Sequence, residues 1–186
     1  MARLIYPLYK EWKIFVLPVI IVLLEKIFIK NIKIHLKFYL TKKIVQGLVR
    51  IKQGKQKVLT LGNLYSRRDW GHARDYVESM WKILQHKEPK DFVIATKTSH
   101  SVKDFINICS KKLNIKLIWK NRGLKEIGID KLTKKTIIKV DKKYFRETEV
   151  DNLIGDFTKA KKLLQWKPKY SFNKLVDDMI YNELNG

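Results

Sequence analysis

From residue 41 onward, the spacing of apolar positions changes repeatedly between the helical and the strand period, as in an α/β protein. Thr41 can cap a first helix and Gly54 can end it. The apolar positions on one face of this helix are Ile44, Leu48 and Ile51. The sequence "SVKD" at 101–104 has the form of a capping box, which predicts another helix start. Strands are expected at 58–63, 91–96, 116–120 and 136–141, and further helices at 71–86, 158–165 and 171–184.

The helix at 71–86 is expected to bury one apolar stripe against the rest of the domain. The stripe consists of Ala73, Tyr76, Val77, Met80, Trp81 and Leu84. Pro168 separates the last two helices, and no internal repeat or low-complexity linker is present in the sequence.

Residues 1–40 have a different pattern. Positions 14–24 form an apolar run of 11 residues that Pro18 interrupts, and positions 26–40 alternate basic and apolar residues. A helix that spans a bilayer needs about 20 apolar residues, so this run is too short to cross one. Three interpretations stay open for it: a buried part of the core, contact with a membrane surface, or the apolar part of a signal peptide.

The charge is extreme, with a formal net value of +22 over 186 residues. It comes from 33 lysines and 7 arginines, and it is spread over the whole chain. Arginine is the usual residue for bidentate recognition of phosphates and guanine, so a surplus of lysine favours a diffuse solvated surface. We therefore expect no nucleic-acid partner. Cys109 is the one cysteine in the sequence, which excludes an internal disulfide and favours a reducing cytoplasm.

A first candidate site follows the strand at 58–63. The turn Gly62-Asn63 comes after that strand, and Arg67 and Arg68 lie just before the next helix. The start of a helix attracts anions, and an adjacent arginine can bind a phosphate with two hydrogen bonds. The alternative is structural: Asp69 caps the helix, and the two arginines pair with Asp75 and Glu78. The spacing alone leaves both interpretations open.

A second candidate pair is Arg146 and Glu149, three residues apart. The arginine could bind a phosphate while the carboxylate accepts hydrogen bonds from a ribose diol, but an ordinary surface ion pair has the same spacing. Tyr9 and Lys13 have the spacing of a tyrosine base and its lysine, which chance readily produces in a lysine-rich chain. The histidines at 35, 72, 86 and 100 have no metal-ligand spacing among themselves or with Cys109.

Several of these segments together resemble the C-terminal part of the GDP-mannose 4,6-dehydratase family, whose members are extended short-chain dehydrogenases/reductases. The resemblance covers about residues 41–184, and its segments follow the family's order. They are "TKKI" (41–44), "LGNLYSRRDWGHARDYVESMW" (61–81), "EPKDFVIAT" (88–96), "HSVKDF" (100–105), "GIDK" (128–131), "YFRETEVDNLIGDFTKAKKLLQWKPKYSF" (144–172) and "LVDDM" (175–179).

The resemblance implies a Rossmann domain that binds NADP(H) and a smaller C-terminal region that binds the nucleotide sugar. The family converts GDP-mannose to GDP-4-dehydro-6-deoxymannose and water. By motif position, the resemblance places six residues around the GDP group: Lys43, Gly62, Asn63, Arg68, Arg146 and Glu149. It therefore favours the ligand-binding interpretation of both candidate sites. It also implies GDP-mannose as a partner, NADP as a cofactor, and a homo-oligomer as found in the family.

The departures from the family are equally specific. In the family, the glycine-rich loop, the catalytic Thr and Glu, and the Tyr-x-x-x-Lys pair precede the matching region. Here residues 1–40 contain no glycine, and a dinucleotide loop needs glycines at its tight turn. Glu147 replaces a proline, and Gln165 replaces a usual glycine.

We therefore expect an incomplete Rossmann-type α/β fold, with residues 1–40 unrelated to the family and residues 41–186 forming its substrate-binding region. A broken reading frame would explain residues 1–40. We expect a truncated dehydratase that is inactive by itself, and we assign no catalytic residue. Two alternatives stay open: an enzyme completed by a partner chain that carries the cofactor half, and a basic protein that binds a membrane surface.

Overall fold

The computed structural model describes residues 40–145 and 152–185. Its larger sheet is mixed and has four strands among these residues. Its strands, in spatial order, are β1 (Leu59–Leu61), β6 (Thr136–Val140), β5 (Ile127–Asp130) and β4 (Leu117–Lys120). β1 and β6 run parallel, and the other two pairs are antiparallel. The chain divides into two compact units, 1–43 and 44–186, and this sheet belongs to the second.

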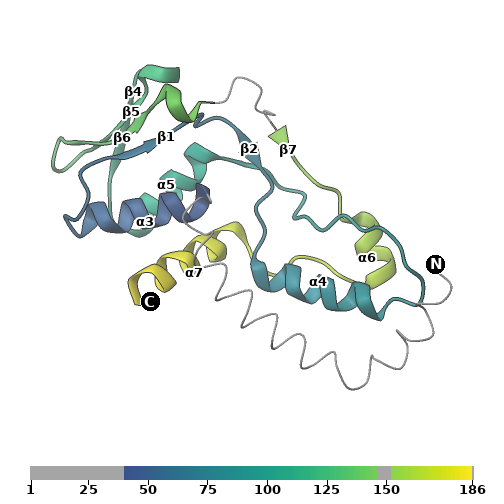
Figure 1. The fold of residues 1–186 in the computed structure, drawn as a ribbon. Helices are drawn as coiled ribbons and strands as arrows, with labels where there is room; N and C mark the ends of the chain where they lie inside the picture. Colours follow the sequence, from purple (N-terminus) through teal and green to yellow (C-terminus); the bar gives the residue numbers. More distant parts are fainter. Residues whose placement is uncertain (1–39, 146–151, 186) are drawn as a thin grey trace. The chain divides into compact units, whose positions relative to one another are not determined.

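The helices α3 (Leu40–Lys52) and α5 (Val102–Lys112) accompany this sheet (Figure 1). α3 buries Ile44 and Leu48 on the face that the sequence predicts. Gly47 marks its close approach to β1, because a side chain there would begin 2.8 Å from Leu59 Cδ1. The helix ends at Lys52, and Gly54 terminates it as expected, with a positive φ of 73° and a hydrogen bond from its amide to the Ile51 carbonyl.

α5 starts with the capping box that the sequence predicts. Ser101 Oγ accepts a hydrogen bond from the Asp104 amide, and the Asp104 carboxylate accepts one from the Ser101 amide. The helix buries Phe105, Ile106 and Cys109 and packs against α7 (Phe172–Asn185). These contacts join the C-terminal helix to the core of the sheet.

A second, three-stranded sheet has the order β3 (His100–Ser101), β2 (Arg67–Arg68) and β7 (Asn152–Leu153). β2 pairs antiparallel with β3 and parallel with β7. This small sheet brings together three segments that are far apart in the sequence.

The helices α4 (Ala73–Gln85) and α6 (Thr158–Leu164) pack together beside the chain that leads to α7 (Figure 1). Between them lies a buried cluster around Trp166, whose ring nitrogen donates to the Asp75 carbonyl at 3.0 Å. The Asp75 carboxylate is buried and accepts hydrogen bonds from the backbone amides of Lys169 and Tyr170. Polar contacts therefore hold α4 against residues 166–170.

The prediction that α4 buries its apolar stripe is wrong, because a different face of the helix is buried. Val77, Met80, Trp81 and Leu84 are exposed, whereas Asp75 and Ser79 are buried. The Asp75 carboxylate is on the inward face, and its hydrogen bonds with backbone amides offset part of the cost of burying it.

Two further details differ from the expected strands. Residues 91–96 form no strand and follow an irregular path. β5 was not expected, and the short 3₁₀ helices η2 (Gly123–Lys125) and η3 (Lys142–Tyr144) flank it and β6. In the part of the chain that the structure describes, no helix has both the length and the apolar character needed to cross a membrane. The apolar run at 14–24 lies outside that part.

Candidate functional site

The carboxyl ends of the two parallel strands β1 and β6 form the centre of the candidate site. Gly62 follows β1, and η3 follows β6. The Asp141 amide donates to the Leu61 carbonyl at 2.9 Å, which fixes the two strand ends together. Ligands of open α/β sheets bind at the carboxyl ends of the strands. The arrangement is therefore consistent with a ligand site at this edge.

Gly62 fits this edge because it has no side chain. A Cβ at this position would overlap the backbone carbonyl oxygen of Tyr144 in η3. The neighbouring Asn63 fixes the next turn, because its Oδ1 accepts a hydrogen bond from the Tyr65 amide at 2.9 Å. The predicted pair of turn residues therefore forms the junction between β1, η3 and the loop that leads to β2.

The two arginines of β2 have different surroundings. Arg67 is held by α5 and the chain before it: its guanidinium donates to Ser99 Oγ and to the Ser99 carbonyl, and lies 3.7 Å from the Asp104 carboxylate. Arg68 Nη1 donates to the Arg67 carbonyl at 2.7 Å. Arg67 therefore has a structural position. The family resemblance names Arg68, and not Arg67, as the ligand residue.

The structural alternative, in which Arg67 and Arg68 pair with Asp75 and Glu78, is wrong. Asp75 binds the backbone at 169–170, and Glu78 forms an ion pair with Lys169 at 2.6 Å, so neither acid pairs with the two arginines. The N-cap of α4 is His72, whose Nδ1 accepts from the Arg74 amide at 3.1 Å.

Asp69 has a different role from the predicted cap. Its carboxylate accepts hydrogen bonds from the amides of Thr96, Lys97 and Gly155, and from the Thr96 hydroxyl. These donors come from the chain before β3 and the chain after β7. Asp69 therefore fixes the backbone on both sides of the arginine strand.

His72 is also part of the scaffold. Its Nε2 lies 3.2 Å from the carboxylate of Asp178 on α7, and its ring stacks on Tyr170. The hydrogen bond from Lys174 is the main cause that lowers the pKa of Asp178, and His72 acts in the same direction. These contacts give His72 a structural role.

β7 pairs with the strand that carries the two arginines. Arg67 and Arg68 stand opposite Asn152 and Leu153 in the parallel β2–β7 pair. Arg146 and Glu149 lie outside the described residues, in the segment 146–151. The chain enters that segment after Tyr144, beside Gly62, and leaves it at β7, beside the two arginines. The described residues on either side of the segment therefore contact Gly62 and the arginine strand.

Lys43 lies near the start of α3, in the unit 1–43, and Tyr9 and Lys13 lie outside the described residues. Among residues 40–145 and 152–185, no group of three or more His, Cys, Asp and Glu side chains could hold a metal ion. Burial raises the pKa of the Cys109 thiol to about 12, so it is protonated at neutral pH.

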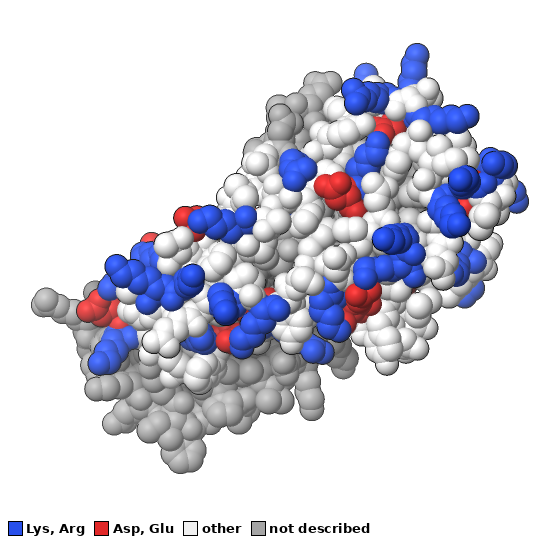
Figure 2. All heavy atoms as spheres, turned by 180° about the vertical axis from the view of Figure 1, so that it is seen from behind, with Lys and Arg blue, Asp and Glu red and all other residues white. Residues whose placement is uncertain are grey.

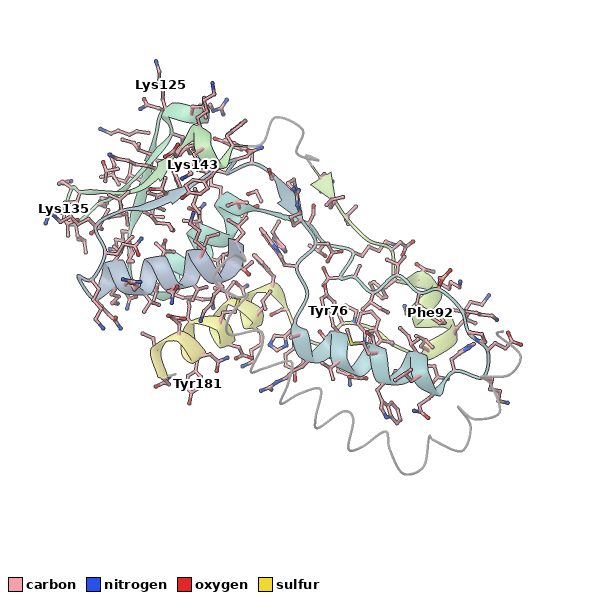
Figure 3. The ribbon with its side chains drawn as sticks, viewed as in Figure 1. Tyr76, Phe92, Lys125, Lys135, Lys143 and Tyr181 are labelled. Atoms are coloured by element: carbon pink, nitrogen blue, oxygen red, sulfur yellow. The ribbon has the colours of Figure 1, made fainter. Side chains whose placement is uncertain are left out.

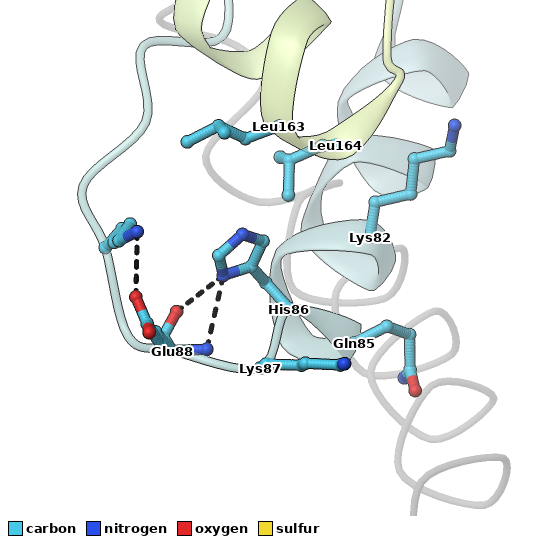
Figure 4. A pocket seen from close by; sticks show the side chains of 8 residues that line it. Lys82, Gln85, His86, Lys87, Glu88, Leu163 and Leu164 are labelled. Atoms are coloured by element: carbon cyan, nitrogen blue, oxygen red, sulfur yellow. Dashed lines mark hydrogen bonds and ion pairs between the residues drawn. The ribbon is translucent and has the colours of Figure 1, made fainter.

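Two hollows in the described part of the chain do not contain the Gly62-Asn63 turn. A cavity of about 360 Å³ beside β3 is lined by Trp70, His100, Tyr170 and Phe172, among others. A larger one of about 530 Å³ lies at the C-terminal end of α4, between His86 and the leucines at 163 and 164 (Figure 4). The larger cavity is about 20 Å from the start of α4 by the rise of a 13-residue helix.

The basic side chains of the described residues are dispersed. On the described part of the face drawn in Figure 2, Lys and Arg are spread widely, with Asp and Glu among them. Lys125, Lys135 and Lys143 stand on η2, on the turn before β6 and on η3 (Figure 3). This distribution agrees with the diffuse surface expected from the lysine surplus.

Sequence reasoning missed three residues next to the candidate site. The Tyr65 hydroxyl donates to Glu126 Oε1 at 3.1 Å, and Lys103 Nζ lies 2.6 Å from the same oxygen. Glu126 is only 1% exposed. No spacing in the sequence signals this cluster, because its members come from the β1–β2 loop, α5 and the residue before β5.

A sequence model described as "GDP-mannose 4,6 dehydratase" matches residues 22–179. This match begins inside the segment 1–40, for which the sequence predicts no relationship, and the boundary at residue 40 stays a prediction. The chain is 47% identical over 146 residues to the GDP-mannose 4,6 dehydratase of Dictyostelium discoideum and 44% identical to that of Homo sapiens. Each alignment covers 78% of this chain. It spans 41% and 39% of those relatives, which is about two-fifths of their length.

The fold has a counterpart among solved structures. The structure of RMD from Pseudomonas aeruginosa complexed with NADPH superimposes with a TM-score of 0.64 at 14% sequence identity, covering 80% of this chain and 43% of that one. This agreement shows a shared Rossmann-type α/β fold, of which the present chain has a part. The NADPH in that structure also agrees with a nicotinamide cofactor in proteins of this fold.

Proposed function

Because the chain belongs to the GDP-mannose 4,6 dehydratase family, we propose that residues 44–185 form a nucleotide-sugar-binding region whose ligand is GDP-mannose. The observation that carries the proposal is a pair of contacts on either side of the segment 146–151. Tyr144 lies against Gly62 before it, and Asn152 and Leu153 pair with Arg67 and Arg68 after it. Gly62 and Arg68, two of the six residues named by the family resemblance, take part in these contacts, which support the proposal.

The chemistry of each residue fits one part of the ligand. Arg68 binds the pyrophosphate, because a planar guanidinium can donate two parallel hydrogen bonds to phosphate oxygens. Gly62 lets the backbone approach closely, and Asn63 holds the turn. Arg146 and Glu149 are the proposed partners of the second phosphate and the ribose diol. Lys43 stays a prediction from the resemblance alone.

The described residues do not fit a dinucleotide cofactor. A dinucleotide fingerprint needs three glycines between a strand and the helix that follows it. Between β1 and α4 the chain has Gly62 and Gly71, and the space at Gly71 is taken by the Tyr76 ring. We therefore assign no step of hydride transfer to residues 40–145 and 152–185, and we propose ligand binding without turnover.

Calorimetry tests the binding proposal. Titration of the full chain with GDP-mannose should release heat, and Arg68→Ala should weaken binding about tenfold to a hundredfold, which is the range for a lost charge-assisted hydrogen bond. Arg122→Ala is the matched control, since Arg122 is an exposed arginine in the turn after β4. The absence of heat at millimolar GDP-mannose would overturn the proposal.

A second measurement tests the absence of turnover. The full chain is incubated with NADP and GDP-mannose, and the sugar product is analysed. Unchanged GDP-mannose is expected. Formation of the 4-dehydro sugar would show that the chain holds a complete active site and would overturn this part of the proposal.

A further inference from the structure

We propose that Tyr65 is the platform on which the base of the nucleotide ligand stacks. The inference rests on the proposed function, because it names the residue that would recognise one part of that ligand. It concerns a residue for which neither the motif spacing nor the family resemblance suggests a role.

Tyr65 lies where a nucleotide that contacts the Gly62-Asn63 turn can reach it. It is two residues beyond Asn63, and its backbone amide donates to the Asn63 side chain at 2.9 Å. The two residues therefore share one rigid turn at the carboxyl end of β1. Arg67 and Arg68 follow at once in β2. A base on Tyr65 and a phosphate on Arg68 would thus be held by one short segment of chain.

The ring of Tyr65 is both exposed and held in place. The residue is 46% exposed, yet its hydroxyl donates to Oε1 of Glu126, which is 1% exposed. Exposed aromatic side chains are ordinarily free to change rotamer, and ordering them on binding costs affinity. A hydrogen bond to a buried carboxylate orders the Tyr65 ring before any ligand arrives.

Lys103 holds the carboxylate in turn. Its Nζ lies 2.6 Å from the same Glu126 oxygen, 5.4 Å from the centre of the Tyr65 ring and 4.7 Å from the centre of the Trp119 ring. A buried carboxylate needs a partner charge of this kind. The Lys103–Glu126 ion pair therefore fixes the position of the Tyr65 ring, although this ring is half exposed.

A planar nucleobase is the ligand group that such a ring fits. Bases stack on tyrosine rings in single-stranded nucleic-acid complexes, and the interaction tolerates any base because every base has a π face. Tyr65 would therefore increase affinity for nucleoside diphosphates as a class. The choice of guanine over other bases would need hydrogen bonds from other groups.

The test compares a ligand that carries a base with one that has neither base nor ribose. GDP and inorganic pyrophosphate are titrated into the full chain and into its Tyr65→Ala variant. We expect the substitution to weaken GDP binding about tenfold, the effect of losing one base–aromatic stack, and to leave pyrophosphate binding unchanged. Tyr181→Ala is the matched control, because Tyr181 is 67% exposed on α7.

Two further variants keep the test decisive if Tyr65→Ala does not fold. Tyr65→Phe keeps the ring without the hydroxyl, and Tyr65→Leu keeps volume without a π face. Phe should retain more GDP affinity than Leu. Equal GDP affinity in both variants, or an equal loss of GDP and pyrophosphate binding, would overturn the stacking role. Failure of the unaltered chain to bind GDP would instead overturn the proposed function.

Discussion

The backbone carbonyl oxygen of Tyr144 occupies the space in which a side chain on Gly62 would begin. Residue 144 ends η3, after β6, and residue 62 follows β1, so this contact closes the edge where the parallel strands end. Replacement of Gly62 by Ala should force the two segments apart, at a cost of about 2–4 kcal/mol in the free energy of unfolding. Urea denaturation of the variant measures this cost.

Gly123→Ala is the control for that substitution. Gly123 has a positive φ of 61° and nothing within 4 Å of its Cβ position. It should therefore cost only the backbone strain, about 1–2 kcal/mol. Equal destabilisation by the two substitutions would contradict a steric role of the Tyr144 carbonyl.

The four hydrogen bonds to Asp69 give a second prediction. Asp69→Asn keeps the shape but replaces one acceptor oxygen by an NH₂ group, which must face an amide or hydroxyl donor of the set around it. Each unsatisfied group costs about 1–3 kcal/mol, so the free energy of unfolding should fall by at least about 1 kcal/mol. Thermal denaturation measures the fall. The same change at the exposed Asp91 should have almost no effect.

The Lys103–Glu126 pair gives a third prediction. Lys103→Met leaves the nearly inaccessible Glu126 carboxylate without its cation, and breaking a buried pair in this way costs about 3 kcal/mol or more. The double variant Lys103→Met/Glu126→Gln should recover part of the stability, because it removes the unpaired charge as well. A double variant no more stable than Lys103→Met would show that the charge is not the cause.

Lys90→Met is the matched control for this pair. Lys90 lies 2.8 Å from Glu88, but both side chains are largely solvent-exposed. Surface pairs of this kind contribute less than about 1 kcal/mol. The two lysines therefore differ in the burial of the partner carboxylate, which is the quantity under test.

The parts of this fold that could be predicted are those that local signals in the sequence determine. The capping box of Ser101 and Asp104 and the glycine that ends α3 depend on neighbouring residues alone, and both are confirmed. Asp69 shows where local reasoning stops. Its position before α4 suggests a cap, but donors 27 and 86 residues away take its oxygens. Spacing cannot reveal partners at that separation.

In the candidate site, too, local features could be predicted and contacts between distant segments could not. Gly62-Asn63 and the two arginines are visible as a turn and a charged stretch, whereas their meeting with η3 and β7 depends on pairings between distant strands. The exposed stripe of α4 follows the same rule, because the Asp75 carboxylate on the inward face accepts hydrogen bonds from distant backbone amides. Lys43, Arg146 and Glu149 stay predictions of the family resemblance.

The stack of His100 on Phe172, with ring centres 3.8 Å apart, predicts a dependence of stability on pH. Burial lowers the pKa of His100 below its ordinary value of 6.5, and the charge of Arg67 acts in the same direction, while Asp104 and Asp69 oppose it. Below about pH 6.5 the unfolded chain therefore binds more protons than the folded chain at this residue, so the His100 contribution to stability is lost as the pH falls. His100→Phe keeps a stacked ring without a titrating group, and it should flatten the dependence between about pH 5 and about pH 7.5 in urea denaturation. An unchanged slope in this variant would exclude His100 as its source.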